Sequence, residues 1–214
     1  MTVGPMAAAD LALRRAAPVV VLASASAARA ALLQGAGVAV AVEAAAIDEA
    51  EVKASLRAAG AAAAEVAESL AELKAQRIAR RHPGALVIGA DQVLDCDGTL
   101  FDKPTDAADA RRQLLLLRGR RHELVSAAVV VRDGVRLWHH VGRATLTMRR
   151  FSDAFLDDYL DAAGDAVLAS VGAYQVEGVG AQLFARIDGD YFTILGLPLL
   201  PVLDFLREQG VLLP

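Results

Sequence analysis

Short apolar runs that are rich in β-branched residues alternate along the chain with longer stretches in which apolar residues recur at helical spacing. The short runs predict strands at residues 18–23, 38–42, 86–88, 122–132 and 135–149. The longer stretches predict helices at residues 27–34, 61–81, 103–118, 152–164 and 198–207. Asp133-Gly134 joins two strands as a hairpin, so the pattern predicts an α/β fold with a mixed sheet.

The strand predicted at 86–88 ends at two small residues, and Asp91 follows them directly. A carboxylate that a rigid strand holds in apolar surroundings suits metal binding or base catalysis. The turn at Asp97-Gly98 returns the chain, so Lys103 is expected in the same neighbourhood. A carboxylate and a cation at a strand end outline a phosphate site. The alternative is that Asp91 is only a turn former or a helix cap.

The first strand runs into a hydroxyl-rich turn, with Ser24 and Ser26, and then into the helix at 27–34. This arrangement presents free backbone N–H groups and the positive end of a helix dipole to an anion. Arg29, about one turn inside the helix, is placed to reach the same anion. In the alternative interpretation, Ser26 is a plain N-cap and Arg29 is a solvated charge.

Lys74 lies between Leu70 and Ile78 on the apolar stripe of the helix at 61–81. A lysine in that position either extends its amine to solvent or points it at a partner, because an unpaired buried charge is costly. Before this helix, Asp48-Glu49 brings paired acids into what we expect to be a loop.

Gly172, Gly178 and Gly180 indicate a backbone that another group approaches closely, and Glu177 lies among them. The spacing is neither that of a Walker loop nor that of a dinucleotide fingerprint. Neither of those phosphate-binding mechanisms is therefore supported.

Length and charge limit the remaining possibilities. We expect a short N-terminal extension at 1–17 and a single domain at 18–214, since domains typically have about 100 to 200 residues. Lys+Arg 22 against Asp+Glu 26 gives 22 − 26 = −4, which argues against a nucleic-acid partner. An anionic ligand must then meet a local cluster of cations or a metal.

The chain is expected to be soluble, with no membrane partner. Its longest apolar runs, 18–23 and 195–203, are far below the roughly 20 residues that a membrane helix needs, and no signal-peptide pattern is present. The single Cys96 excludes an intrachain disulfide and predicts a reducing, cytoplasmic compartment.

Together these residues resemble the Maf (septum-formation) family of nucleoside triphosphate pyrophosphatases. The matching segments run in family order from about residue 18 to residue 207, and they are specific jointly rather than singly. They are Leu22 to Ser26 with Arg29, Ile47-Asp48-Glu49, Leu73-Lys74-Ala75, Gly89-Ala90-Asp91, Lys103-Pro104, Ser126, Gly172 to Tyr174, Glu177-Gly178, and Gly189 to Tyr191 with Gly196-Leu197-Pro198.

The resemblance implies hydrolysis of the α–β phosphoanhydride of a nucleoside triphosphate, giving the monophosphate and pyrophosphate, with Mg²⁺ or Mn²⁺. Carried over by position, Asp91 activates water as base or metal-linked acid, and Glu49 assists with metal or water. These two are therefore the implied metal ligands. The implied catalytic residues are Asp91, Glu49, Lys74 and Lys103, and the implied substrate-binding residues are Ser24, Ser26, Arg29, Gln92 and Glu177.

The resemblance also implies an elongated, curved sheet with helices on both sides, in which two lobes surround a nucleotide cleft as in Maf/ITPase-like folds. It further implies a homodimer. The physical argument agrees with the site, because a tetra-anionic substrate that meets a protein of net charge −4 needs concentrated cations and a metal.

Departures from the family pattern bear on the substrate. Ala28 stands where pyrimidine-specific members carry a further arginine and where 7-methyl-GTP members carry tryptophan. Gln92 and Glu177 instead resemble the 7-methyl-GTP subgroup. We therefore favour a modified purine over dTTP or UTP, because a carboxylate can accept hydrogen bonds from a guanine N–H edge. Phe192 and Thr193 replace the family's common Ser and Asn, which bears on the local loop geometry.

A rival interpretation is a nucleotide-binding regulator of cell division with little turnover. A chain that only binds nucleotide has little reason to keep both acids and all the cations together. The retained set therefore favours catalysis: Asp91, Glu49, Lys74 and Lys103.

Overall fold

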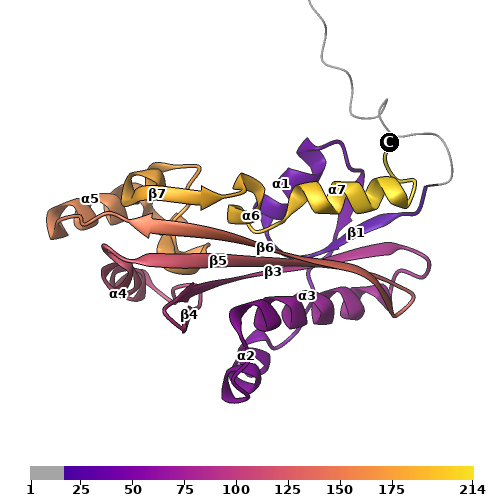
Figure 1. Cartoon of the computed structure of the whole chain (residues 1–214), viewed down its shortest axis with the longest axis horizontal. Coiled ribbons are helices and arrows are strands. Elements are labelled where there is room, and N and C mark those ends of the chain that lie inside the picture. The colour runs from indigo at the N-terminus through magenta and orange to yellow at the C-terminus, as the bar shows by residue number, and fades with distance from the viewer. Residues whose placement is uncertain (1–16) are drawn as a thin grey trace, which may run out of the picture.

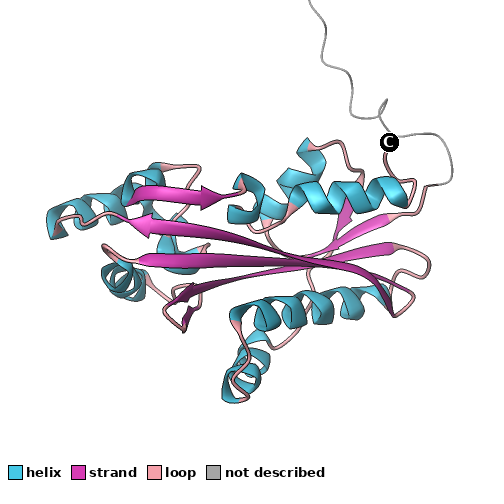
Figure 2. Ribbon diagram, in the orientation of Figure 1, coloured by secondary structure: helices cyan, strands magenta, loops and turns pink. Residues whose placement is uncertain are grey.

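The computed structural model describes residues 17–214, so the expected N-terminal extension lies almost wholly outside the described residues. An elongated mixed sheet carries helices on both faces (Figures 1 and 2). Its strands are β1 Val20–Ala23, β2 Val40–Val42, β3 Leu86–Cys96, β4 Thr99–Phe101, β5 Arg121–Arg132, β6 Val135–Met148 and β7 Phe184–Gly189. The helices are α1 Ala27–Gly35, α2 Glu49–Ala58, α3 Ala63–Ala79, α4 Ala107–Leu117, α5 Asp153–Ala163, α6 Tyr191–Ile194 and α7 Leu199–Glu208. The predicted α/β class is confirmed.

The strand order is β2-β1-β3-β5-β6-β7, and β4 pairs separately with β3. β1 is parallel to β2 and β3, while the other pairs are antiparallel. The hairpin predicted at Asp133-Gly134 is confirmed, since it joins β5 to β6. In Figure 1 these two strands and β3 run the length of the molecule.

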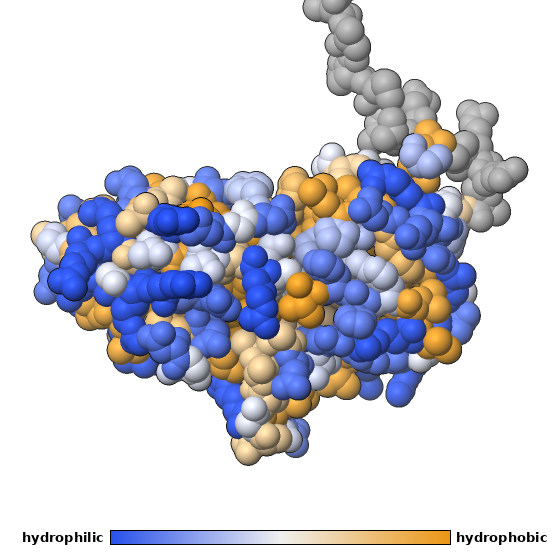
Figure 3. Space-filling model, in the orientation of Figure 1, coloured by the Kyte–Doolittle hydropathy of each residue, from blue (hydrophilic) through white to orange (hydrophobic). Residues whose placement is uncertain are grey.

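Three apolar clusters hold the helices on the sheet. Side chains of α1 and α7 pack on one face, and those of α3 pack on the opposite face. Towards the other end of the sheet, α4 and α5 enclose a third cluster with the short 3₁₀ turns that follow α5. On the face drawn in Figure 3, hydrophilic and apolar residues are interspersed. None of the helices in the described part of the chain has the length and apolar character needed to cross a membrane.

The prediction that a strand ends before Asp91 is wrong. β3 continues to Cys96 because β5 pairs with it as far as Asp95, which satisfies the backbone groups that face β5. Gly89 does not break the strand but lets α3 come close: a Cβ at this position would lie 1.9 Å from the carbonyl oxygen of Ala71. Asp91 is therefore held in mid-strand rather than at a strand end.

β3 has an unpaired stretch on one edge. Its pairing with β1 ends at Gly89, and its pairing with β4 begins at Leu94. In the described chain no strand covers residues 90–93 on that edge, although β5 pairs with them on the other. The sheet therefore has a gap through which both of its faces can be reached.

The expectation that Asp48-Glu49 lies in a loop is wrong, because α2 starts there. Asp48 caps this helix by accepting a hydrogen bond from the Glu51 N–H at 3.0 Å, and Glu49 is its first residue. The apolar pattern missed α2 because it has no fully buried residue, and only Val52 and Leu56 pack partly against the α3 cluster.

Side chains cap other helices as well. Ser26 and Ser152 cap α1 and α5 through their hydroxyls, and Asp106 caps α4, which begins four residues after the predicted start at 103. Gly164 ends α5 at a φ of 53°, in the left-handed region that glycine adopts without strain.

We predict that Gly89→Ala destabilises the protein, because the added methyl group must displace the α3 backbone. The expected loss in the free energy of unfolding is about 3 kcal/mol, at the upper end for overpacking. Urea titration followed by circular dichroism measures it. Gly35→Ala is the matched control, since nothing lies within 4 Å of a Cβ there. Equal stability of both variants would contradict the close contact.

Candidate functional site

A cleft of about 830 Å³ opens at the gap in the sheet. It is lined by the β1–α1 turn, α2, α3, β3, the β4–α4 connection and two later segments, 169–177 and 194–196. Because the gap joins both faces of the sheet, side chains that alternate along β3 reach the same cavity. All nine residues predicted from sequence line it: Ser24, Ser26, Arg29, Glu49, Lys74, Asp91, Gln92, Lys103 and Glu177.

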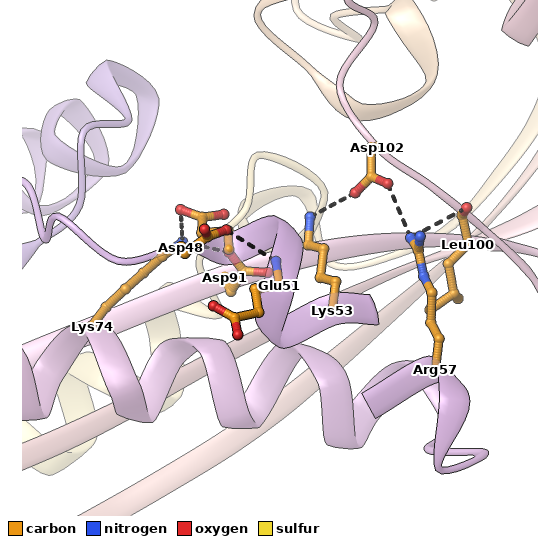
Figure 4. Close-up of polar contacts among 9 residues, drawn as sticks. Asp48, Glu51, Lys53, Arg57, Lys74, Asp91, Leu100 and Asp102 are labelled. Carbon is orange, nitrogen blue, oxygen red and sulfur yellow. Dashed lines mark hydrogen bonds and ion pairs between the residues drawn. The ribbon is translucent and has the colours of Figure 1, made fainter. Parts of the chain in front are cut away.

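Lys74 lies between two carboxylates. Its Nζ is 2.6 Å from Asp91 Oδ1 (Figure 4) and 2.9 Å from Glu49 Oε1. Lys74 is 6% exposed and Asp91 5%. The ammonium therefore does not extend to solvent, and of the two alternatives left open by the sequence, the structure selects the one in which it meets a partner. Burial at this depth makes each of the two charges depend on the other.

The second carboxylate oxygen of Asp91, Oδ2, is buried and has no hydrogen-bond partner among the described residues. An anionic oxygen without a partner costs free energy, so it is poised to accept a hydrogen bond or to bind a cation. No group of three or more His, Cys, Asp or Glu side chains in the described chain is placed to hold a metal ion. The two acids that contact the Lys74 ammonium are Asp91 and Glu49.

The pKa of Glu49 lies below its ordinary value. Partial desolvation raises the pKa, but the charge and hydrogen bond of Lys74 lower it, as do the charges of Lys53 and Arg29. Glu49 is therefore ionised at neutral pH. Its negative charge repels another anionic group unless a cation lies between the two.

The buried Arg29 side chain forms hydrogen bonds with segments on both sides of the gap. Its Nε donates to the carbonyl of Gly196 at 2.7 Å, and its Nη1 donates to the carbonyl of Ala90 at 2.9 Å and to Ser24 Oγ at 3.2 Å. Desolvation lowers the pKa of Arg29, while Asp91 and Glu49 raise it. Arg29 is therefore not a solvated charge, although Ser26 is indeed the N-cap of α1.

Gln92 has a fixed amide orientation. Its Nε2 donates among three acceptors, namely Ser126 Oγ at 2.9 Å and the carbonyls of Thr193 at 3.1 Å and Ile194 at 3.0 Å. The Ser126 hydroxyl donates to the same Thr193 carbonyl at 2.8 Å. The amide nitrogen is thus fully used within the protein, and the carbonyl oxygen of Gln92 is the group left for a ligand.

Lys103 and Glu177 are exposed at the rim of the cleft. The pKa of Lys103 lies below the ordinary lysine value. Partial desolvation lowers it, and the positive charges of Arg29 and Lys74 lower it further. The charges of Glu49 and Asp91 raise it, but by less. Neither residue forms a side-chain hydrogen bond with the described chain, so both remain available to a ligand.

Three charged residues of the cleft were not predicted from sequence. Lys53 and Arg57 lie on α2, and both form ion pairs with Asp102, which precedes Lys103 (Figure 4). The signal was present as a spacing, because Glu49, Lys53 and Arg57 recur every four residues. It was missed because no helix was predicted there.

Comparison with known proteins gives a family and several relatives. The family model described as Maf-like protein matches residues 19–209. A nucleoside triphosphate pyrophosphatase of Paramagnetospirillum magneticum is 62% identical over 193 residues, which is 90% of this chain and 100% of the relative. One of Rhodospirillum rubrum is 57% identical over 92% of this chain and 97% of the relative. A 7-methyl-GTP pyrophosphatase of Mesorhizobium japonicum is 51% identical over 90% of this chain and 97% of the relative.

We predict that Lys74→Met destabilises the protein by about 3 kcal/mol, because it leaves the Asp91 carboxylate buried without its cation. The deficit should shrink as the pH falls, since the pKa of a lone buried carboxyl is raised and protonation removes its charge. The double variant Lys74→Met/Asp91→Asn should recover most of the loss. Urea unfolding at pH 7 and pH 5 measures all three, and an unchanged stability of Lys74→Met would contradict the pairing.

Proposed function

The chain belongs to the Maf family, and from this premise we propose that it is a nucleoside triphosphate pyrophosphatase. The observation that carries the proposal is the buried Lys74 ammonium, which holds the Asp91 and Glu49 carboxylates together inside a cleft that also presents Lys103. Relatives at 62% and 57% identity bear this name. The substrate class follows, because cations and acids side by side suit a polyphosphate and the water that attacks it.

In the proposed reaction, water attacks the α-phosphorus of the triphosphate and loses a proton to Asp91. The bond from that phosphorus to the bridging oxygen breaks, and pyrophosphate leaves with the bonding electron pair. Asp91 Oδ2 has no other hydrogen-bond partner in the described chain, so it is the oxygen available for the proton. Lys74 keeps Asp91 in position, and Lys103 offsets negative charge on the phosphates.

We also propose that Asp91 and Glu49 bind a divalent cation, Mg²⁺ or Mn²⁺, together with the substrate. The donors fit, because Mg²⁺ is commonly bound through one or two carboxylates plus substrate phosphates and waters. When bound, such an ion would neutralise charge that develops on the leaving pyrophosphate. The lowered pKa of Glu49, which keeps this carboxylate ionised, supports this role.

For the base, we propose a guanine-type nucleotide such as 7-methyl-GTP. Gln92 can offer only its carbonyl oxygen, and Glu177 offers a carboxylate, so both are acceptors. The guanine edge presents adjacent N–H donors, whereas uracil and thymine present one N–H between two carbonyls. A relative at 51% identity that is named 7-methyl-GTP pyrophosphatase supports this choice.

The site of action and the assembly also stay proposals. Cytoplasmic action as a homodimer is in keeping with the family resemblance and with Cys96, which is a buried free thiol.

Pyrophosphate release from 7-methyl-GTP, GTP, UTP and dTTP tests the function, each with Mg²⁺, Mn²⁺ and chelator. We expect metal-dependent release, strongest on 7-methyl-GTP, and a loss of at least about 10³-fold in Asp91→Asn with nucleotide binding largely kept. A preference for UTP or dTTP would reject the proposed base, and full activity in Asp91→Asn would remove Asp91 from the mechanism. No release from any substrate would favour the nucleotide-binding regulator.

The lowered pKa of Lys103 predicts that kcat/KM begins to fall at a lower alkaline pH than an ordinary lysine would cause. Below its pKa, Lys103 is charged and attracts phosphate; as the pH rises through that lowered pKa the charge is lost, so kcat/KM should fall before an ordinary lysine would titrate. Lys103→Arg keeps its charge and should move the fall to higher pH. Identical alkaline limbs in pH profiles of the two proteins would show that another group titrates.

A further inference from the structure

One face of α2 carries two cations, Lys53 and Arg57, that the reaction described above does not use. Glu49, Lys53 and Arg57 lie four residues apart and so share a face, and all three line the cleft. Glu49 pairs with Lys74, whereas among residues 17–214 Lys53 and Arg57 form ion pairs only with Asp102. Since α2 has no fully buried residue, these side chains do not serve the apolar core.

Asp102 binds both cations at once. Lys53 Nζ donates to Asp102 Oδ1 at 2.9 Å, and Arg57 Nη2 donates to Asp102 Oδ2 at 3.1 Å (Figure 4). Arg57 Nη2 also lies 3.5 Å from the carbonyl oxygen of Leu100. A carboxylate whose two oxygens each meet one cation has the charge and the spacing of two oxygens of a phosphate.

The carboxylate is the more exposed partner of this arrangement. The Asp102 side chain is 51% exposed, against 14% for Lys53 and 37% for Arg57. Asp102 lies in the connection between β4 and α4, outside both elements. It can turn into solvent without disturbing the core, whereas the cations stay on the wall of the cleft.

Lys53 and Arg57 lie close in the chain to residues that the proposed reaction uses. Lys53 lies one helical turn after Glu49 on the same face of α2, so the two side chains are neighbours. Lys103 directly follows Asp102 in the chain. By contrast, two other cations of the cleft are already committed, because Arg29 donates to three oxygens and Lys74 to two carboxylates.

We propose that Lys53 and Arg57 form the subsite for the terminal phosphates of the substrate and for the pyrophosphate product, and that Asp102 occupies this subsite in the ligand-free chain. This inference rests on the proposed function and names the anion subsite of the same cleft. Binding of the polyphosphate exchanges one anion for another on the same two cations, so no cation is left unpaired in either state.

Calorimetric titration with pyrophosphate and with guanosine monophosphate, each with Mg²⁺ and with chelator, tests the proposal. Lys53→Met and Arg57→Gln should each weaken pyrophosphate binding about tenfold, the effect of one charge-assisted hydrogen bond. Asp102→Asn should strengthen it several-fold, because a competing anion is removed. Guanosine monophosphate, which has no terminal phosphates, should bind equally to all four proteins. Lys53→Arg should retain pyrophosphate binding, which separates loss of charge from misfolding.

The proposal predicts weaker pyrophosphate binding when a cation is removed and stronger binding when Asp102 is neutralised. These opposite changes distinguish an anion subsite from a set of ion pairs that only fixes α2 in place. Such a set would be loosened by all three substitutions, so weaker pyrophosphate binding in Asp102→Asn would overturn the proposal, as would unchanged binding in Lys53→Met and Arg57→Gln. Arg111→Gln and Asp157→Asn are the matched controls, since that pair is 3.0 Å apart, similarly exposed and outside the cleft. Equal effects of these controls would assign the result to net charge. The proposed function is tested by a different measurement. It fails if the unmodified protein releases no pyrophosphate from any triphosphate, whereas the subsite fails on the binding of pyrophosphate to the variants.

Discussion

The site depends on four residues of β3, 90–93, that pair with a neighbouring strand on one edge only. β1 is too short to cover them, and β4 begins only beyond them. On this edge the Arg29 guanidinium donates a hydrogen bond to the carbonyl of Ala90. The gap is what allows Asp91 and Gln92, which project to opposite faces of one strand, to line a single cavity.

Charge pairing explains why so polar a cavity exists inside an alanine-rich fold. Its lining contains five cations, Arg29, Lys53, Arg57, Lys74 and Lys103, and four acids, Glu49, Asp91, Asp102 and Glu177. Buried charges are tolerated only when they are paired, and the deepest pair, Lys74 with Asp91, meets that condition within the protein. Charges at the rim are screened by water and can exchange partners at smaller cost. The depth of a pair thus separates residues that are fixed from residues that can receive a ligand.

The orientation of Gln92, the residue proposed to bind the base, depends on segments that join the cleft from far along the chain. The α6 carbonyls of Thr193 and Ile194 orient the Gln92 amide, and Arg29 ties the carbonyl of Gly196 to the opposite wall. Thr193, one of the departures from the family pattern, contributes here through its backbone, and its N–H is held by the Asp190 carboxylate at 2.7 Å. A different side chain at 193 therefore leaves these hydrogen bonds possible.

The sequence by itself determined the alternating fold class, most caps and turns, and nine of the residues that line the cleft. These features depend on local periodicity and on short motifs, which a linear pattern preserves. It did not determine the continuation of β3 past Gly89, because the pairing with β5 that sustains it is non-local. It also missed α2, whose ten residues bury nothing completely. Only the tertiary structure decided that Lys74 meets Asp91 and Glu49, and that Asp102 meets Lys53 and Arg57, because contacts between distant elements leave no periodic trace in the chain.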